Sequence, residues 1–102
     1  MNWQSYSIAN YDDCMDIVRS VIPTYIAPEE VKDFIRFLEN IERWSCRYGV
    51  VVVEQQVVAC DGLAVEGIAA TLCWGLVRAD WHSRGVGTFM LRERLNWAQA
   101  NP

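Results

Sequence analysis

The chain contains 102 residues, of which 52% are hydrophobic and 22% are charged, and its formal net charge is −4. These values fit one globular domain over residues 1–102 and exclude a disordered or low-complexity chain. The acidic balance disfavours nucleic-acid binding, and the sequence shows neither an apolar run long enough to span a membrane nor a signal peptide.

The first half of the sequence predicts one strand followed by two helices. Residues 3–8 alternate loosely between polar and apolar types and indicate a strand. Asn10 can then cap a helix that Pro23 ends, and a second helix begins near Pro28. Apolar residues at helical spacing define the expected buried faces, which are Cys14, Ile17, Val18 and Val21, then Val31, Phe34, Ile35, Leu38 and Ile41.

The second half changes to the residue pattern of a sheet. Turns at 55–56 and 65–67 separate three apolar runs that predict strands, namely Tyr48–Glu54, Val57–Leu63 and Ile68–Val77. A charged, aromatic loop over 78–85 then leads into a helix over 86–100, whose expected inward-facing residues are Met90, Leu91, Leu95 and Ala98. The order of elements predicts an α/β (α+β) domain with a mostly antiparallel sheet flanked by helices.

The four cysteines do not form a recognisable metal or redox motif. Cys14, Cys46, Cys60 and Cys73 include no Cys-x-x-Cys pair, and the only histidine is His82. We therefore expect no metal site, and instead free thiols among apolar residues in a reducing, cytoplasmic setting. A cluster of acids in the first helix, residues 12, 13 and 16, is expected to be a solvated helix face.

Residues 77–88 are the segment most informative about chemistry. A buried strand feeds a short loop, and the loop opens a helix with the sequence Arg84-Gly85-Val86-Gly87. Backbone N–H groups at a helix start lack helical partners and, together with the helix dipole, favour a phosphate group. The surrounding charge supports this, since residues 78–102 carry four arginines and two acids while residues 1–77 carry five bases and eleven acids. A tight strand-to-helix turn without a ligand is the alternative.

Two common phosphate motifs do not fit this segment. A dinucleotide fingerprint requires a third glycine where Met90 stands, and a Walker loop requires Gly-Lys-Ser/Thr, whereas the only lysine is Lys32. The segment instead resembles the Gln/Arg-x-x-Gly-x-Gly/Ala signature of the GNAT superfamily of N-acetyltransferases, in the form His82-Ser83-Arg84-Gly85-Val86-Gly87. The order of elements over nearly the whole chain is also similar to the N-terminal part of that fold.

The resemblance implies a site for acetyl-coenzyme A (CoA). The amides of Ser83–Thr88 would hold its pyrophosphate, and the backbone of Leu76 and Val77 would pair with the pantetheine arm. The implied coenzyme-binding residues are Leu76, Val77, His82, Ser83, Arg84, Gly85, Val86, Gly87 and Thr88. An acceptor pocket beside the second helix is implied for Tyr25, Phe37 and Trp44, with Phe37 on the helix surface as the alternative.

Three departures from the family pattern bear on activity. His82 stands where Gln or Arg is usual but can still donate a hydrogen bond, and Ala79 replaces a proline. Thr71 stands where many relatives carry a glutamate base, so the remaining candidates for the catalytic group are Thr71 itself and Asp61.

The resemblance also leaves an open sheet edge. The chain ends before the C-terminal strands of the family fold, so the strand at 68–77 is expected to lack a neighbour on one side, which a homodimer would cover. The expected function is acetyl-CoA-dependent acetylation of a primary amine on a small molecule or peptide. The alternative is a non-catalytic CoA-binding or structural module, half of a dimeric assembly.

Overall fold

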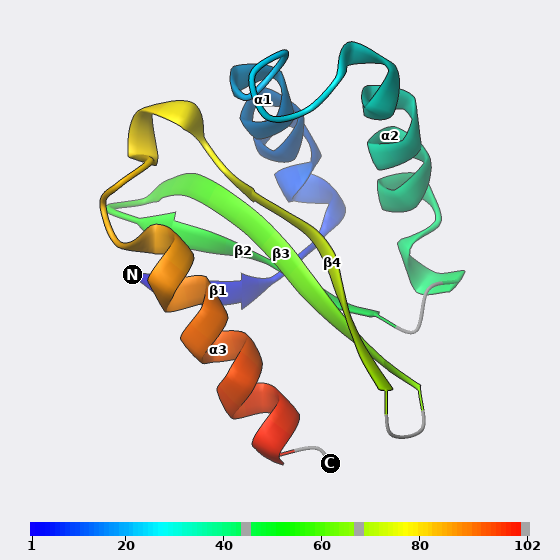
Figure 1. Ribbon diagram of the computed structural model, residues 1–102, viewed down its shortest axis with the longest axis vertical. Coiled ribbons are helices and arrows are strands. Elements are labelled where there is room, and N and C mark those ends of the chain that lie inside the picture. The colour runs from blue at the N-terminus through cyan, green and yellow to red at the C-terminus, as the bar shows by residue number, and fades with distance from the viewer. Residues whose placement is uncertain (44–45, 67–68, 101–102) are drawn as a thin grey trace.

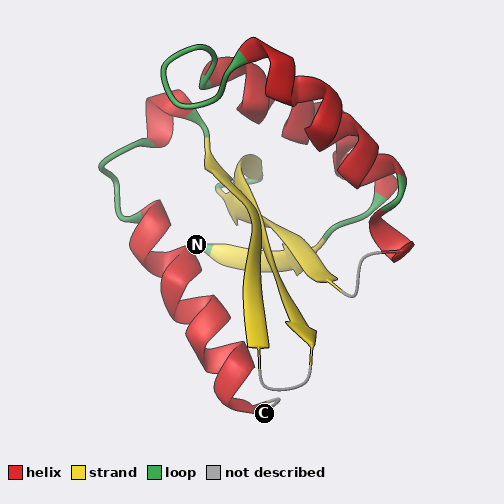
Figure 2. Ribbon diagram, turned by 45° about the vertical axis from the view of Figure 1, so that its right-hand side comes forward, coloured by secondary structure: helices red, strands yellow, loops and turns green. Residues whose placement is uncertain are grey.

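The computed structural model describes residues 1–43, 46–66 and 69–100. Four antiparallel strands form one sheet in the order β1-β2-β3-β4, with bounds Asn2–Ser5, Cys46–Val53, Gln56–Glu66 and Ala69–Val77 (Figure 1). Helices α1 (Tyr11–Ser20) and α2 (Val31–Glu39) cover one face, and α3 (Val86–Ala100) lies on the other (Figure 2). The predicted α/β fold with an antiparallel sheet between helices is confirmed.

Two apolar clusters hold the layers together. The larger lies under α1 and α2, where Ile17 and Phe34 pack towards Val50 of the sheet. The smaller lies under α3, where only Val86 and Met90 of the helix are buried. Since α3 has few buried apolar residues, its position depends on other contacts with the sheet as well. No described helix is both long and apolar enough to cross a lipid bilayer.

The inward-facing residues predicted for α3 are partly wrong. Met90 is buried as expected, but Leu91 and Leu95 are 47% and 53% exposed. Val86 and Met90 are four residues apart, and so are Leu91 and Leu95, so both pairs have the spacing of one helix face. Periodicity alone could not decide which pair faces the sheet.

Several predicted boundaries also shift. The β2–β3 turn lies at Glu54 and Gln55, which both have positive φ, so Gln56 already belongs to β3 and pairs with Val53. Strand β3 runs on to Glu66 instead of turning at 65, and residues 67–68 lie outside the described residues. The first strand ends at Ser5, because a 3₁₀ turn over Ile8–Asn10 comes before α1.

Asn10 precedes α1 as expected but does not cap it with its side chain. Its Oδ1 instead accepts a hydrogen bond from the backbone N of Ser7 at 3.0 Å. All four cysteines are free, and the three acids of α1 are exposed, as predicted. Among the described residues, no group of three or more metal-ligating side chains is found.

Strand β4 is the edge of the described sheet, with β3 as its only neighbour. Its Leu72 is 59% exposed, and an apolar edge strand favours pairing with another chain. We expect a homodimer that sediments at about 50 µM with twice the 11.7 kDa mass of the chain. Leu72→Lys should shift it towards monomer, whereas Ile8→Lys, at an exposed site of the β1–α1 connection, should not. A parent chain that sediments only as a monomer would contradict the expectation.

Candidate functional site

Strand β4 passes directly into the loop that opens α3. The last ladder contact of the strand is the hydrogen bond from Arg78 N to Val58 O at 2.8 Å, and a 3₁₀ turn over Ala79–Trp81 follows. Ala79 N donates to Oγ of Ser20 at 3.0 Å, and that hydroxyl donates to Ile17 O at 2.7 Å. The end of α1 therefore anchors the start of the loop.

His82 holds the loop in place through contacts within the protein. Its Nε2 lies 2.7 Å from the carbonyl oxygen of Val77, and its ring packs edge-on against Tyr25 with the ring centroids 5.1 Å apart. From the sequence, the ring N–H of His82 is expected to donate a hydrogen bond to a bound coenzyme. In the structure, Nε2 is engaged inside the protein, so this nitrogen fixes the loop against the end of β4.

The start of α3 presents unpaired backbone amides. Ser83 and Gly85 have φ of 63° and 84°, and the first helical hydrogen bond runs from Phe89 N to Gly85 O at 3.0 Å. The amides of Val86, Gly87 and Thr88 therefore have no partner within the helix. A Cβ added to Gly87 would meet nothing within 4 Å, so space is open beside this residue, and Thr88 is also exposed, whereas Val86 is buried.

The charge at this helix start is positive. The dipole of a fifteen-residue helix adds a partial positive charge to the amides, and Arg84 lies exposed beside them. The guanidinium of Arg84 lies 4.8 Å from the ring centroid of Trp81, which holds it near the loop. Amides, an arginine and open space suit a phosphate or pyrophosphate group.

The edge of β4 offers one of the two expected backbone positions. Because Arg78 bonds to Val58, the next pair along, Val77 and Ala59, is a non-hydrogen-bonded pair, and Val77 directs its N–H and C=O towards the open edge. By the same alternation, Leu76 directs its backbone groups to Cys60 of β3, and its side chain is buried. The expectation that the Leu76 backbone faces a ligand is therefore wrong.

A β-bulge interrupts β4 halfway along. Between the pairs Cys60–Leu76 and Gly62–Cys73, the strand has two residues where β3 has only Asp61. The first of them, Trp74, has φ of 30°, and its carbonyl accepts a hydrogen bond from the Tyr48 hydroxyl at 2.8 Å. A bulge leaves backbone groups outside the ladder, so it marks a place where an amide can serve a ligand.

A groove of about 620 Å³ lies between α2 and this part of β4. Its lining consists of Asp33, Arg36, Phe37, Leu72, Cys73 and Trp74. Phe37 belongs to it, yet most of its side chain is buried and its ring lies 5.0 Å from that of Tyr48. Tyr25, 67% exposed, packs on the loop instead, and Trp44 lies outside the described residues.

The two candidates for a catalytic group lie in different surroundings. Thr71 is exposed on β4. Asp61 is fully buried on the α3 face of the sheet, where Oδ1 accepts a hydrogen bond from Trp3 Nε1 at 2.9 Å and Oδ2 lies 3.3 Å from Arg94 Nε. Burial raises the pKa of Asp61, and the Trp3 N–H and the Arg94 charge oppose the rise. These contacts are those of a structural carboxylate under α3.

Two solved structures share this arrangement of elements. One is the PaiA N-acetyltransferase from Thermoplasma acidophilum in complex with coenzyme A, with a TM-score of 0.74, 11% identity, 97% of this chain covered and 72% of that one. The other is an aminoglycoside 6′-N-acetyltransferase complexed with coenzyme A, with a TM-score of 0.71, 13% identity and coverage of 98% and 56%. This chain has the GNAT fold. No protein-family model and no curated protein sequence matches it.

This chain thus spans about three quarters of the length of the PaiA N-acetyltransferase and just over half of the length of the aminoglycoside 6′-N-acetyltransferase. Sequence reasoning located the strand, the loop and the helix over residues 77–88, but it missed the groove residues Asp33, Arg36 and Cys73. No short motif marks them, because α2 and β4 are far apart in the sequence and meet only in the fold. Gly75 within the apolar run of β4 is the signal in the sequence that could have indicated the bulge, because an isolated glycine inside a strand often marks one.

Proposed function

We propose that this chain binds acetyl-CoA at the start of α3 and transfers the acetyl group to a primary amine. The observation that carries the proposal is the exposed pair Gly87 and Thr88 at the helix start, whose amides have no partner within the helix. The residues present fit the pyrophosphate of the coenzyme, with Ser83, Arg84 and Gly85 completing the loop around it. His82 acts as a positioning residue that ties the loop to Val77.

The open edge of β4 extends the same site. The N–H of Val77 faces outward and can pair with an amide of the pantetheine arm as an added strand would. Beyond it, the bulge at Trp74 and Gly75 leaves strand amides outside the ladder, and one of them can polarise the acetyl carbonyl. The coenzyme, when bound, supplies the thioester whose acetyl group is transferred.

The groove between α2 and β4 is proposed to receive the amine. It reaches the bulge through Cys73 and Trp74, and Phe37 forms part of its wall. The carboxylate of Asp33 attracts the ammonium group of the amine substrate into the groove. The guanidinium of Arg36 can bind a negatively charged group elsewhere on the same substrate. Small-molecule amines and peptide amines both fit this description.

The proposed chemistry proceeds without a strong side-chain base. Thr71 cannot take a proton at neutral pH, and the Asp61 carboxylate is engaged by Trp3 and Arg94 under α3. The amine therefore loses its proton to solvent before attack. Its lone pair then bonds to the acetyl carbon, the carbon–sulfur bond breaks and the thiolate leaves. The nitrogen releases one further proton to water as the amide forms, and the thiolate takes up one proton from water, so the protons balance. A general base contributes about 10²–10⁴-fold, so we expect slow turnover.

Calorimetric titration with CoA, followed by thiol release over a panel of amines from pH 6 to 10, tests the proposal. We expect binding, and a rate that rises with pH as the deprotonated fraction of each amine rises. Binding without thiol release above the uncatalysed rate would favour the non-catalytic CoA-binding module instead. Absence of binding would contradict both. The free thiols of the chain suit the reducing compartment expected for either function.

A further inference from the structure

Two cysteines lie on either side of the central strand β3. Cys46 is the first residue of β2 and Cys73 belongs to β4, and both are free and half-buried. Both pack against the larger apolar cluster under α1 and α2. We name them the β2–β4 thiol pair. The inference below concerns this pair and does not depend on the proposed function.

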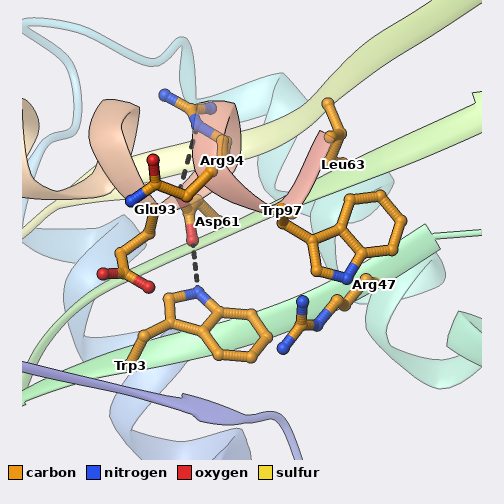
Figure 3. A pocket seen from close by; sticks show the side chains of 9 residues that line it. Trp3, Arg47, Asp61, Leu63, Glu93, Arg94 and Trp97 are labelled. Carbon is orange, nitrogen blue, oxygen red and sulfur yellow. Dashed lines mark hydrogen bonds and ion pairs between the residues drawn. The ribbon is translucent and has the colours of Figure 1, made fainter. Parts of the chain in front are cut away.

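The residues of β3 alternate between the two faces of the sheet. Asp61 points towards α3, where its carboxylate contacts Trp3 and Arg94 (Figure 3). The next residue, Gly62, therefore faces α1 and α2. Cys73 is the register partner of Gly62 on β4 and shares its face. The Cys73 thiol thus lies on the side of the α2–β4 groove, and Cys73 belongs to the lining of that groove.

The glycine at position 62 lets the two thiols approach each other. Cys46 is the register partner of Ala64, two residues along β3 from Gly62, so it lies on the same face. A Cβ at Gly62 would lie 2.8 Å from Sγ of Cys46, so this sulfur occupies the space above the glycine. On β4, Sγ of Cys73 lies 3.7 Å from the carbonyl oxygen of Thr71, which is the partner of Ala64 on that side. Both sulfurs therefore lie over the same short stretch of β3.

The width of β3 between the two cysteines excludes a disulfide unless the backbone moves. Neighbouring strands are about 4.8 Å apart, so two strands with a third between them are about 10 Å apart. The Cα atoms that a disulfide joins are at most about 7 Å apart. A cation between the sulfurs spans a longer distance, because two metal–sulfur bonds of roughly 2.3 Å each replace one sulfur–sulfur bond of about 2 Å.

The surroundings of Cys46 restrict what can bind there. Burial and the neighbouring Cys73 thiol raise the pKa of Cys46 to about 12. The Cys46 thiol is therefore protonated at neutral pH, and a protonated thiol is a poor nucleophile. A ligand for the pair must bond to sulfur strongly enough to displace the proton, as soft metal cations do.

The number of available ligands selects among the soft cations. Structural zinc requires four ligands, and no group of three or more metal-ligating side chains is found in the part of the chain that the structure describes. Copper(I) favours sulfur ligands, and two thiolates on opposite sides of the ion satisfy it. The free cysteines also fit a reducing compartment, in which copper is monovalent.

We propose that the β2–β4 thiol pair binds one copper(I) ion, with Sγ of Cys46 and Sγ of Cys73 as its two ligands. The two thiols release their protons to water as the metal–sulfur bonds form, and no electron is transferred. The ion enters from the α2–β4 groove, where Cys73 is accessible. Because the bound ion links β2 to β4 across β3, it should also raise the melting temperature of the chain.

The test titrates the full chain into the complex of copper(I) with bicinchoninate, in anaerobic and reducing buffer. The loss of absorbance of this complex counts the ions that the protein takes up. We expect one ion per chain, and X-ray absorption at the copper edge should show two sulfur ligands. No uptake, one ion shared by two chains, or an ion with three or more ligands would each overturn the proposal.

Cys46→Ser and Cys73→Ser each remove one ligand. Either change should weaken copper(I) binding at least about 100-fold, because the loss of a group that only supports a ligand already costs about 10–100-fold. Cys14→Ala is the matched control and should bind as the parent does, since Cys14 is completely buried and belongs to α1. Unchanged affinity in either serine variant, or lost binding in a folded control, would assign the ion to other ligands.

A measurement on the parent chain decides the question should a variant fail to fold. N-ethylmaleimide alkylates accessible thiols, and mass spectrometry of the peptides identifies which cysteines have reacted. We expect Cys73 to react in the chain without copper and to be protected by one equivalent of copper(I). Equal alkylation of Cys73 with and without the bound ion would overturn the proposal.

Discussion

Gly87→Glu is expected to weaken CoA binding at least about 100-fold. A carboxylate at this position stands among the amides of Val86 and Thr88 and repels the pyrophosphate, and a like-charge contact of this kind costs several kcal/mol. The substitution disturbs no packing, because a Cβ at residue 87 meets nothing within 4 Å. An acid in the first turn also suits the helix dipole, so the melting temperature should stay level or rise.

The matched control is Gln99→Glu, which adds the same charge to an exposed position in the last turn of the same helix. Calorimetric titration of CoA into the parent chain and both variants measures the effect. The control should bind as the parent does, because its charge lies about three turns from the start of α3. Undiminished affinity in a folded Gly87→Glu chain would place the coenzyme somewhere other than the start of α3.

The sequence was sufficient to predict the backbone of the loop that opens α3, because the determinants of that backbone are local. A helix start, a left-handed glycine and a glycine without neighbours are all encoded within residues 83–87, and the helix bounds 86–100 agree with the structure. The same holds for β2, β3 and β4, whose apolar runs predicted each of them to within a few residues of its bounds. Local patterns determine local backbone geometry.

The parts that sequence reasoning missed depend on contacts between distant residues. The choice between Val86–Met90 and Leu91–Leu95 as the buried side of α3 is made by the sheet beneath, since the helix offers apolar pairs in both directions. The role of Asp61 is set by Trp3 and Arg94, which lie 58 and 33 residues away in the sequence. No spacing rule links these three residues, so a buried acid was read as a candidate base.

The Asp61–Arg94 pair also explains how α3 can hold its position with only two buried apolar side chains. Val86 and Met90 fix the first half of the helix, and Arg94 connects the next turn to β3 through its ion pair with Asp61. The helix whose first turn presents the amides is thus tied to β3 by the carboxylate of Asp61 under its middle. Loss of the ion pair should therefore act on the stability of the whole domain as well as on the helix.

Asp61→Ala is accordingly expected to lower the free energy of unfolding by about 3–5 kcal/mol. The change leaves the guanidinium of Arg94, which is only 17% exposed, and the indole N–H of Trp3 without their acceptor, and breaking a buried pair on one side carries a cost of this size. The total free energy of unfolding of a domain of this size is about 5–15 kcal/mol, so a loss of this size is readily measured by denaturant unfolding. The double variant Asp61→Ala, Arg94→Met should recover part of it, because no uncompensated charge remains.

The pH dependence gives a second measurement on the same residue. Burial raises the pKa of Asp61 above its ordinary value of 3.8, so between that value and the raised one the native chain binds more protons than the unfolded chain. The free energy of unfolding contributed by Asp61 therefore falls as the pH rises through this window. Asp61→Asn cannot titrate at this position, so the free energy of unfolding of this variant relative to that of the parent should increase as the pH is raised from about 4.

The control for the Asp61→Ala measurement is Arg92→Met, at an exposed site two residues from Arg94, which should change the free energy of unfolding by no more than about 0.5 kcal/mol. A loss in Asp61→Ala no larger than in this control would show that the pair does not hold α3 on the sheet.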